Sequence, residues 1–214
     1  MRIRPEMPGS SDGLGPKQPR GVILQPMIEL HRDAFPYNAY FCEENIWWLA
    51  KSLADAGLDT ARMRVLLFTN PSQTTLLFNQ REAPPGAPVV WDYHVVLQAM
   101  IDSEAKVLDF DTRLDFPSAY EDYLLRTFTP QSSLPEEYRA WARVIPAESY
   151  LRHFYSDRSH MLGRLPPSEF PDYPIIQPEA GVKAIALQEY RDLRATIGDG
   201  STVQRLSDLY PALG

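Results

Sequence analysis

The sequence predicts an α/β protein built around a mostly antiparallel central sheet. An amphipathic helical pattern begins near residue 42, and several short runs rich in β-branched and aromatic residues follow it. Two of these runs, 89–97 and 106–111, are separated by a short polar stretch and are typical of a hairpin.

Composition limits the classes of protein to consider. The chain has 214 residues, and 21 Lys and Arg against 28 Asp and Glu give a net charge of −7. This acidic balance argues against a protein that binds nucleic acid, because phosphate contacts need clustered cations. Its single cysteine excludes an internally disulfide-stapled scaffold and a cysteine-rich zinc site. The length fits one domain with a substantial core.

Residues 1–27 are rich in Gly and Pro and show no hydrophobic periodicity, so we expect a flexible N-terminal arm. The early arginines precede no apolar run, which argues against a secretory signal. No window approaches the roughly 20 apolar residues that span a bilayer. We therefore expect a cytoplasmic protein without a membrane partner, with residues 28–214 forming a single domain.

The first clear element is a helix that starts at or just after Cys42. Apolar residues recur at the spacing of one helical face, and the acidic residues Glu43 and Glu44 occupy the first turn, where the helix dipole favours them. Gly57 can supply the C-terminal cap. The members of the apolar face are Ile46, Leu49, Ala50 and Leu53.

The strands and the remaining helices follow from similar patterns. We expect strands at 64–69, 89–97 and 106–111, with a further one at 75–79. The second half predicts helices at 119–128, 135–142, 147–155 and 187–194, a short strand at 144–145, an irregular segment at 163–178 and an edge strand at 202–206.

The lone thiol becomes chemically interesting through its position. A helix N-terminus can lower a cysteine pKa and favour the nucleophilic thiolate, which still needs a base. His94 interrupts an apolar strand, and Asp109 and Asp111 interrupt the next one. Because side chains alternate along a strand, both aspartates share one face, so strand geometry offers two partners for His94 and does not choose between them. The pattern is that of a nucleophile–base–orienter triad.

Simpler interpretations exist for each residue alone. A single cysteine is commonly a small buried hydrophobic residue, and a strand histidine is commonly a satisfied core residue. Paired aspartates after a strand often serve loops or helix caps.

The chain carries a series of distinctive motifs: residues 41–47 (FCEENIW), 90–96 (VWDYHVV), 107–112 (VLDFDT), 143–150 (RVIPAESY) and 156–161 (SDRSHM), then the proline-rich 166–174. Together these motifs resemble the protein N-terminal glutamine amidohydrolase family. They span residues 37–176 in the family's order, and the C-terminal forty residues diverge most. The resemblance implies a papain- or transglutaminase-like α/β fold, a monomer, no metal and no cofactor, and a triad of Cys42, His94 and Asp109. Phe41 replaces the tyrosine that the family usually carries.

The implied reaction converts an N-terminal glutamine of a protein or peptide to glutamate and releases ammonia, through a γ-glutamyl thioester. Selecting an N-terminal residue requires a carboxylate for its α-ammonium, because an unpaired buried charge is costly. Among the candidates Glu43, Glu44, Asp92 and Asp157 we favour Glu44, with Asp157 second.

Two further residues are candidates for substrate binding. His160 belongs to the same polar motif as Asp157. Trp91 could wall the pocket, although strict alternation places it on the strand face opposite His94.

Two other functions remain open from the sequence. A cysteine peptidase, transferase or internal-glutamine deamidase of the same fold would need an open groove. A non-catalytic module that binds protein N-termini would have no need of a nucleophile.

Overall fold

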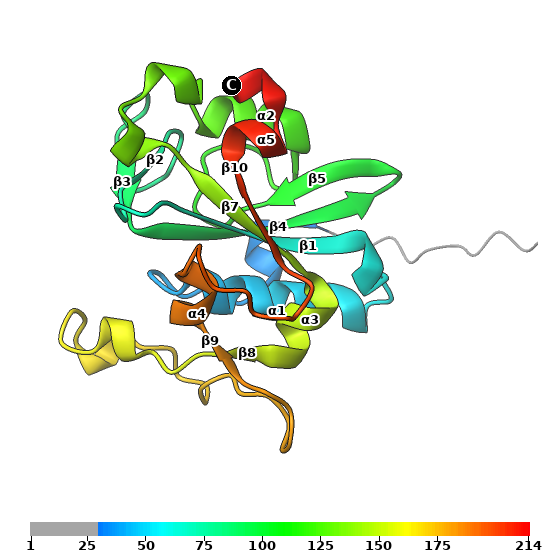
Figure 1. Cartoon of the computed structure of the whole chain (residues 1–214). Coiled ribbons are helices and arrows are strands. Elements are labelled where there is room, and N and C mark those ends of the chain that lie inside the picture. The colour runs from blue at the N-terminus through cyan, green and yellow to red at the C-terminus, as the bar shows by residue number, and fades with distance from the viewer. Residues whose placement is uncertain (1–29) are drawn as a thin grey trace, which may run out of the picture.

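The computed structural model describes residues 30–214, and the predicted arm at 1–27 lies outside the described residues. Its centre is a six-stranded sheet in the order β10-β7-β1-β4-β5-β6, with every neighbouring pair antiparallel (Figure 1). This confirms the mixed α/β class and the antiparallel sheet. The strands are β1 (Met63–Thr69), β4 (Tyr93–Ile101), β5 (Glu104–Leu108), β6 (Ser118–Ala119), β7 (Trp141–Pro146) and β10 (Thr202–Arg205).

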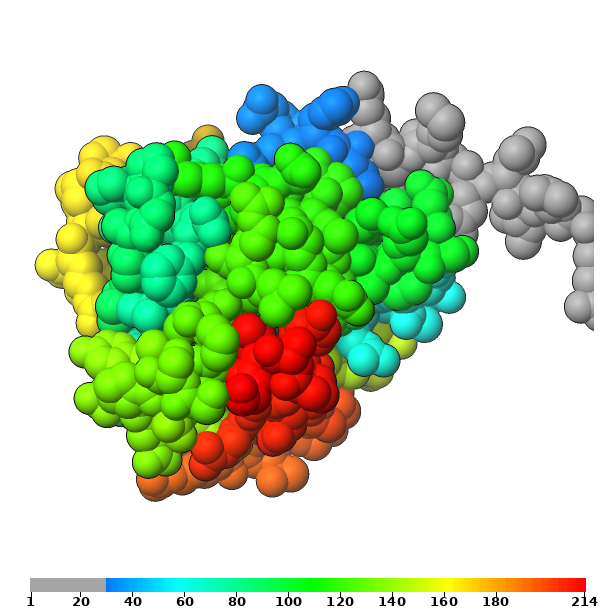
Figure 2. All heavy atoms as spheres, turned by 90° about the horizontal axis from the view of Figure 1, so that it is seen from above, coloured from blue at the N-terminus to red at the C-terminus, as the bar shows by residue number. Residues whose placement is uncertain are grey.

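Helices cover both faces of the sheet, which explains why its central strands are apolar almost throughout. On one face lie α1 (Cys42–Asp55), α3 (Ala147–His153) and α4 (Leu187–Arg191), and on the other lie α2 (Tyr120–Thr127) and α5 (Leu206–Leu209) (Figure 1). Alternate residues of β1 divide between the two cores: Val65 packs in the α1 core and Leu66 in the α2 core. Viewed from above, the C-terminal segment lies against the middle of the chain on the α2 face (Figure 2).

The predicted strand at 89–97 is divided at Asp92. Its first part is β3 (Val89–Trp91), which pairs with β2 (Thr75–Leu77) in a separate two-stranded sheet, and its second part is β4. The hairpin of β4 with β5 is confirmed, but β5 ends at Leu108. Asp109 and Asp111 therefore lie in the loop after the strand, where the alternation of side chains no longer applies.

Most other predicted elements are present with shifted ends, and one is wrong. Residues 135–142 form a single 3₁₀ turn, Glu136–Tyr138, and then enter β7. Alternate side chains Ala140, Ala142 and Val144 pack in the α2 core, so this segment follows the period of a strand. The predicted edge strand is β10, at the edge of the sheet.

A short parallel pair, β8 (Phe154–Tyr155) and β9 (Ile185–Ala186), brackets the proline-rich segment. Within residues 30–214, no helix combines the length and the apolar character needed to cross a membrane.

Candidate active site

Cys42 is the first residue of α1, as the sequence predicts. Its backbone N–H, like those of the rest of the first turn, has no acceptor within the helix. The preceding loop is held rigidly: Asn45 accepts a hydrogen bond from the Asn38 N–H and donates one to the Asn38 carbonyl, both at 2.8 Å. Tyr40 in this loop has a φ of 71°, a left-handed conformation that is strained for tyrosine and that often marks functional sites. The thiol is thus presented from a fixed backbone.

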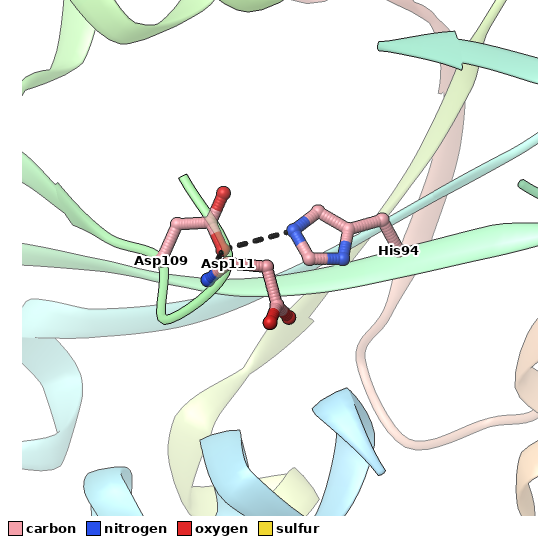
Figure 3. A group of neighbouring side chains, drawn as sticks. All are labelled: His94, Asp109 and Asp111. Atoms are coloured by element: carbon pink, nitrogen blue, oxygen red, sulfur yellow. Dashed lines mark hydrogen bonds and ion pairs between the residues drawn. The ribbon is translucent and has the colours of Figure 1, made fainter. Parts of the chain in front are cut away.

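His94, on β4, and Asp109, in the loop directly after β5, form a buried pair. The imidazole Nε2 lies 3.0 Å from Asp109 Oδ1, and each residue is 1% exposed (Figure 3). Two further donors bind the carboxylate: the Tyr123 hydroxyl at 2.8 Å and the Asp111 N–H at 2.9 Å. The structure therefore pairs His94 with Asp109 and gives the neighbouring aspartate another environment.

The electrostatics of this pair favour two opposite charges. Burial alone lowers the pKa of His94, but the adjacent Asp109 outweighs it and the pKa is raised. Burial alone raises the pKa of Asp109, yet His94 and the hydrogen-bond donors lower it overall. Because Nε2 faces the carboxylate, Nδ1 is the ring nitrogen left to exchange protons elsewhere (Figure 3).

Asp111 accepts a hydrogen bond from the Tyr37 hydroxyl at 2.6 Å, and burial raises its pKa. Within residues 30–214, His94, Asp109 and Asp111 offer ligand atoms within 4.8 Å of one another, close enough to hold a metal ion. A metal would have to replace the bond between His94 and Asp109 and the donors already on Asp109. The side chains fit a hydrogen-bonded relay better than a ligand set.

Cys42 and His94 line one cavity of about 610 Å³. This volume suits a small-molecule or residue-sized ligand. The indole of Trp91 also lines the cavity, with its ring centroid 5.0 Å from that of His94. Strict alternation predicted the opposite face for Trp91, but the break at Asp92 turns β3 out of the main sheet. The other lining residues are Tyr37, Ala39, Tyr40, Arg81, Glu82, Asp92, Tyr93, Asp111, His160, Met161 and Arg164.

The thiol of Cys42 donates a hydrogen bond to Glu43 Oε2 at 3.7 Å. Burial raises the pKa of Cys42 well above its usual value, and the carboxylates of Glu43 and Asp111 add to the rise. The backbone N–H of Val95, next to His94 on β4, acts in the opposite direction. These surroundings favour the thiol over the thiolate in the free site.

Glu44 does not reach the cavity. Its carboxylate oxygens accept two hydrogen bonds of 2.8 Å from the Arg158 guanidinium and one from the Ser156 hydroxyl, and the side chain is fully buried. Asp157 accepts the Ser159 N–H at 3.0 Å and does not line the cavity either. The structure argues against the expected preference for Glu44, because its carboxylate is fully buried outside the cavity. His160 does line the cavity, as expected.

Three residues that bind the carboxylates of the site were not predicted from the sequence. Tyr123 binds the carboxylate of Asp109, and Tyr37 binds that of Asp111. Arg191, from α4 in the divergent C-terminal segment, reaches Asp92 Oδ2 at 3.0 Å and lies 4.6 Å from the Tyr93 ring centroid. No local pattern could have indicated this contact, because its partners are 99 residues apart in the chain.

A thiol at a helix N-terminus and a buried imidazole–carboxylate pair share a cavity in an α/β protein, and this arrangement is compatible with a hydrolase that uses a cysteine nucleophile. Comparison with known sequences also assigns the chain to a family of hydrolases. The N-terminal glutamine amidase family model matches residues 37–210, and the chain belongs to this family of hydrolases.

Curated relatives carry the name protein N-terminal glutamine amidohydrolase. The chain is 33% identical to the Homo sapiens protein over 203 residues, 92% of this chain and 96% of that one. It is 33% identical to the Bos taurus protein over 177 residues, 79% of this chain and 83% of the relative. The Danio rerio protein is 31% identical over 186 residues, 83% and 89% of the two chains.

Proposed function

We propose that the protein deamidates N-terminal glutamine on proteins and peptides, with Cys42, His94 and Asp109 as its catalytic triad. The observation that carries this proposal is the buried pair of His94 and Asp109 in the same cavity as the Cys42 thiol. Residues 28–214 would form a single, monomeric catalytic domain of the papain- or transglutaminase-like kind. The antiparallel sheet, with the nucleophile on the first helix and the base on a strand, is compatible with that fold.

The reaction begins with the thiol proton. His94 Nδ1 takes the proton from Cys42 as the sulfur attacks the side-chain amide carbon of the substrate, and Asp109 stabilises the imidazolium. The developing oxyanion is placed near the Cys42 N–H, which has no acceptor within the helix. The imidazolium then protonates the leaving nitrogen, so that the carbon–nitrogen bond breaks and ammonia leaves a γ-glutamyl thioester.

Hydrolysis of the thioester completes the cycle. His94 removes a proton from a water molecule, the resulting hydroxide attacks the thioester carbon, and the carbon–sulfur bond breaks. The proton returns to the sulfur, which restores the Cys42 thiol and releases the N-terminal glutamate. Every proton is accounted for by His94, the thiol and water.

Selection of an N-terminal residue needs a carboxylate that lines the cavity, and Asp92 now replaces Glu44 in this role. Asp92 is held in place by Arg191 and lies two residues before His94. The same cavity wall includes Trp91 and His160, which would contact the substrate residue. Asparagine is one methylene shorter than glutamine, so its amide would not reach Cys42 while its α-ammonium stays on the carboxylate.

The decisive experiment is mass spectrometry of a glutamine-initiated peptide incubated with the full chain. We expect replacement of one NH₂ by OH and stoichiometric ammonia, with no reaction of the Cys42→Ala variant or of an N-acetylated peptide. Peptide cleavage would support a peptidase instead. Full activity in Cys42→Ala would contradict the proposed mechanism.

Asp92→Asn tests the binding of the α-ammonium. Losing a charged hydrogen-bond partner should raise KM by about 10- to 100-fold with a smaller change in kcat, because such bonds are worth roughly 1.5–3 kcal/mol. Glu82→Gln is the matched control, since Glu82 lines the same cavity and accepts the Trp91 indole N–H at 3.2 Å. A large KM effect in the control with none in Asp92→Asn would move the α-ammonium to Glu82.

A further inference from the structure

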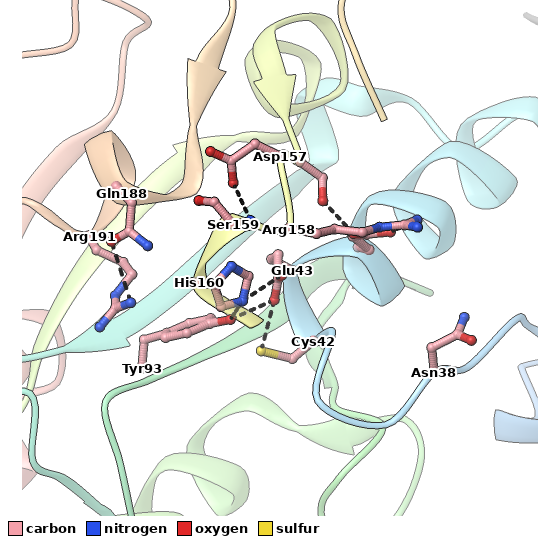
Figure 4. A network of polar contacts seen from close by, with 12 residues as sticks. Asn38, Cys42, Glu43, Tyr93, Asp157, Arg158, Ser159, His160, Gln188 and Arg191 are labelled. Carbon is pink, nitrogen blue, oxygen red and sulfur yellow. Dashed lines mark hydrogen bonds and ion pairs between the residues drawn. The ribbon is translucent and has the colours of Figure 1, made fainter. Parts of the chain in front are cut away.

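Glu43 is a buried titratable group beside the nucleophile that the proposed mechanism does not use. Its Oε2 accepts hydrogen bonds from the Cys42 thiol at 3.7 Å and from the Tyr93 hydroxyl at 2.9 Å. Its Oε1 lies 3.6 Å from His160 Nε2 and, among the described residues, has no hydrogen-bond donor. Figure 4 shows Cys42, Tyr93 and His160 all directed toward this carboxylate.

The charge of Glu43 lacks a cationic partner in direct contact. Tyr93 is a neutral donor, and burial and Arg191 lower the pKa of His160, which favours its neutral imidazole. Tyr150 donates to the backbone carbonyl of Glu43 at 3.0 Å and leaves the side chain unaffected. Burial consequently raises the pKa of Glu43 to about 7. The adjacent Glu44 differs entirely, because Arg158 compensates it.

We propose that Glu43 is a positioning residue that keeps the Cys42 thiol protonated in the free enzyme, in competition with His94 for the thiol proton. A carboxylate that accepts the S–H hydrogen bond stabilises the thiol, and its negative charge opposes a thiolate beside it. The nucleophile would then be released to His94 only as the bond to the substrate carbon forms. This inference rests on the proposed function in taking Cys42 as the nucleophile.

Titratable and charged groups from several elements surround Glu43 and the Cys42 sulfur, and these groups also act on the protonation of the thiol. Tyr93 comes from β4, Tyr150 from α3, and His160 and Arg158 from the segment after β8, while Glu44 neighbours it on α1. Asp109 and Asp111, from the loop after β5, raise the pKa of the thiol from the other side. Glu43 raises the pKa of the thiol more than either aspartate does, and it is the carboxylate that contacts the sulfur.

The test measures the rate at which iodoacetamide alkylates Cys42 between pH 5 and 10, in the full chain without substrate. Cys42 is the chain's only cysteine, so the readout is specific. Glu43→Gln should move the midpoint to lower pH. If the pKa of the thiol falls by about one, its thiolate fraction at neutral pH rises about tenfold and its nucleophilicity falls about threefold, a net acceleration of roughly threefold. Glu82→Gln should leave the profile unchanged.

A profile of folded Glu43→Gln that overlays the wild type would overturn the inference. If Glu43→Gln does not fold, Tyr93→Phe decides: loss of the hydroxyl should raise the pKa of Glu43, neutralise it further and shift the alkylation profile in the same direction by a smaller amount. An unshifted profile in that variant would also overturn the inference. Because alkylation needs no turnover, a shifted profile in a protein that fails to deamidate peptides would refute the proposed function alone.

Discussion

Two sets of buried carboxylates differ in the partners that stabilise their charges: one lies in the loop after β5, on the sheet side, and the other in the first turn of α1, on the helix side. On the sheet side, Asp109 has an imidazole and two hydrogen-bond donors, and its pKa is lowered. On the helix side, Glu44 has the Arg158 guanidinium, whereas Glu43 has only neutral contacts and a pKa raised to about 7. Burial is complete in all three cases. The partner, and not the burial, decides whether the pKa of a buried carboxylate is lowered, as in Asp109, or raised, as in Glu43.

Sequence neighbours therefore have different roles. Glu43 and Glu44 are adjacent on α1, yet the first contacts the thiol and the second attaches the segment that carries His160 to the helix. Asp109 and Asp111 are two residues apart, yet the first is hydrogen-bonded to His94 and the second lines the cavity.

The largest expected effect is a difference in catalytic activity between variants of the two aspartates on the sheet side. Asp109→Asn should lower kcat/KM for a glutamine-initiated peptide by about 10³- to 10⁴-fold, because the amide cannot stabilise the imidazolium and favours the wrong tautomer. Asp111→Asn is the matched control and should cost no more than about tenfold, since it removes one charge near the site without touching the bond between His94 and Asp109. The reverse order would assign the orienting role to Asp111.

The second prediction concerns Glu44, the carboxylate on the helix side whose charge is paired with Arg158. Arg158→Met leaves Glu44 buried without its cation and should lower the free energy of unfolding by about 3–5 kcal/mol, measured by urea denaturation. The double variant Glu44→Gln with Arg158→Met should regain part of that loss, because no uncompensated charge remains. A loss below about 1 kcal/mol in Arg158→Met would show that the pair behaves as an exposed salt bridge.

The smallest expected effect is the pH dependence of the stability that the His94–Asp109 pair contributes. The folded pKa of His94 is raised, so its contribution to stability is fully present below the unfolded value of about 6.5 and is lost as pH rises through the folded pKa. The destabilisation caused by His94→Gln should accordingly be greater at pH 6 than at pH 9. Equal destabilisation at both values in urea titrations would contradict the raised pKa.

Asp109 acts in the acid range with the opposite sign. Its folded pKa is lowered, so its contribution is present above the unfolded value and is lost as pH falls through the folded one. The pH 6 to 9 comparison for His94 lies above this range, which keeps the two contributions separate.

Local patterns were sufficient for much of the fold. The helical face of α1, the strands β1 and β4, the hairpin to β5 and the edge strand β10 all follow from periodicity and turns over fewer than about 20 residues. The prediction was wrong at 135–142, where a strand period was read as helix. It was incomplete at 89–97, where the departure of β3 into a second sheet depends on its pairing with β2.

The sequence by itself determined the residue types and positions of the thiol, the imidazole and the two aspartates, because Cys42 begins a recognisable helical pattern and the other three interrupt apolar runs. Only the tertiary structure decided their partners. It placed Asp109 and not Asp111 on His94, gave Arg158 to Glu44 across 114 positions, brought Arg191 to Asp92 across 99, and left Glu43 uncompensated against the thiol. The physical reason is that the pKa of a buried charge depends on groups within a few ångströms in space, and the chain order of a sequence does not contain those distances.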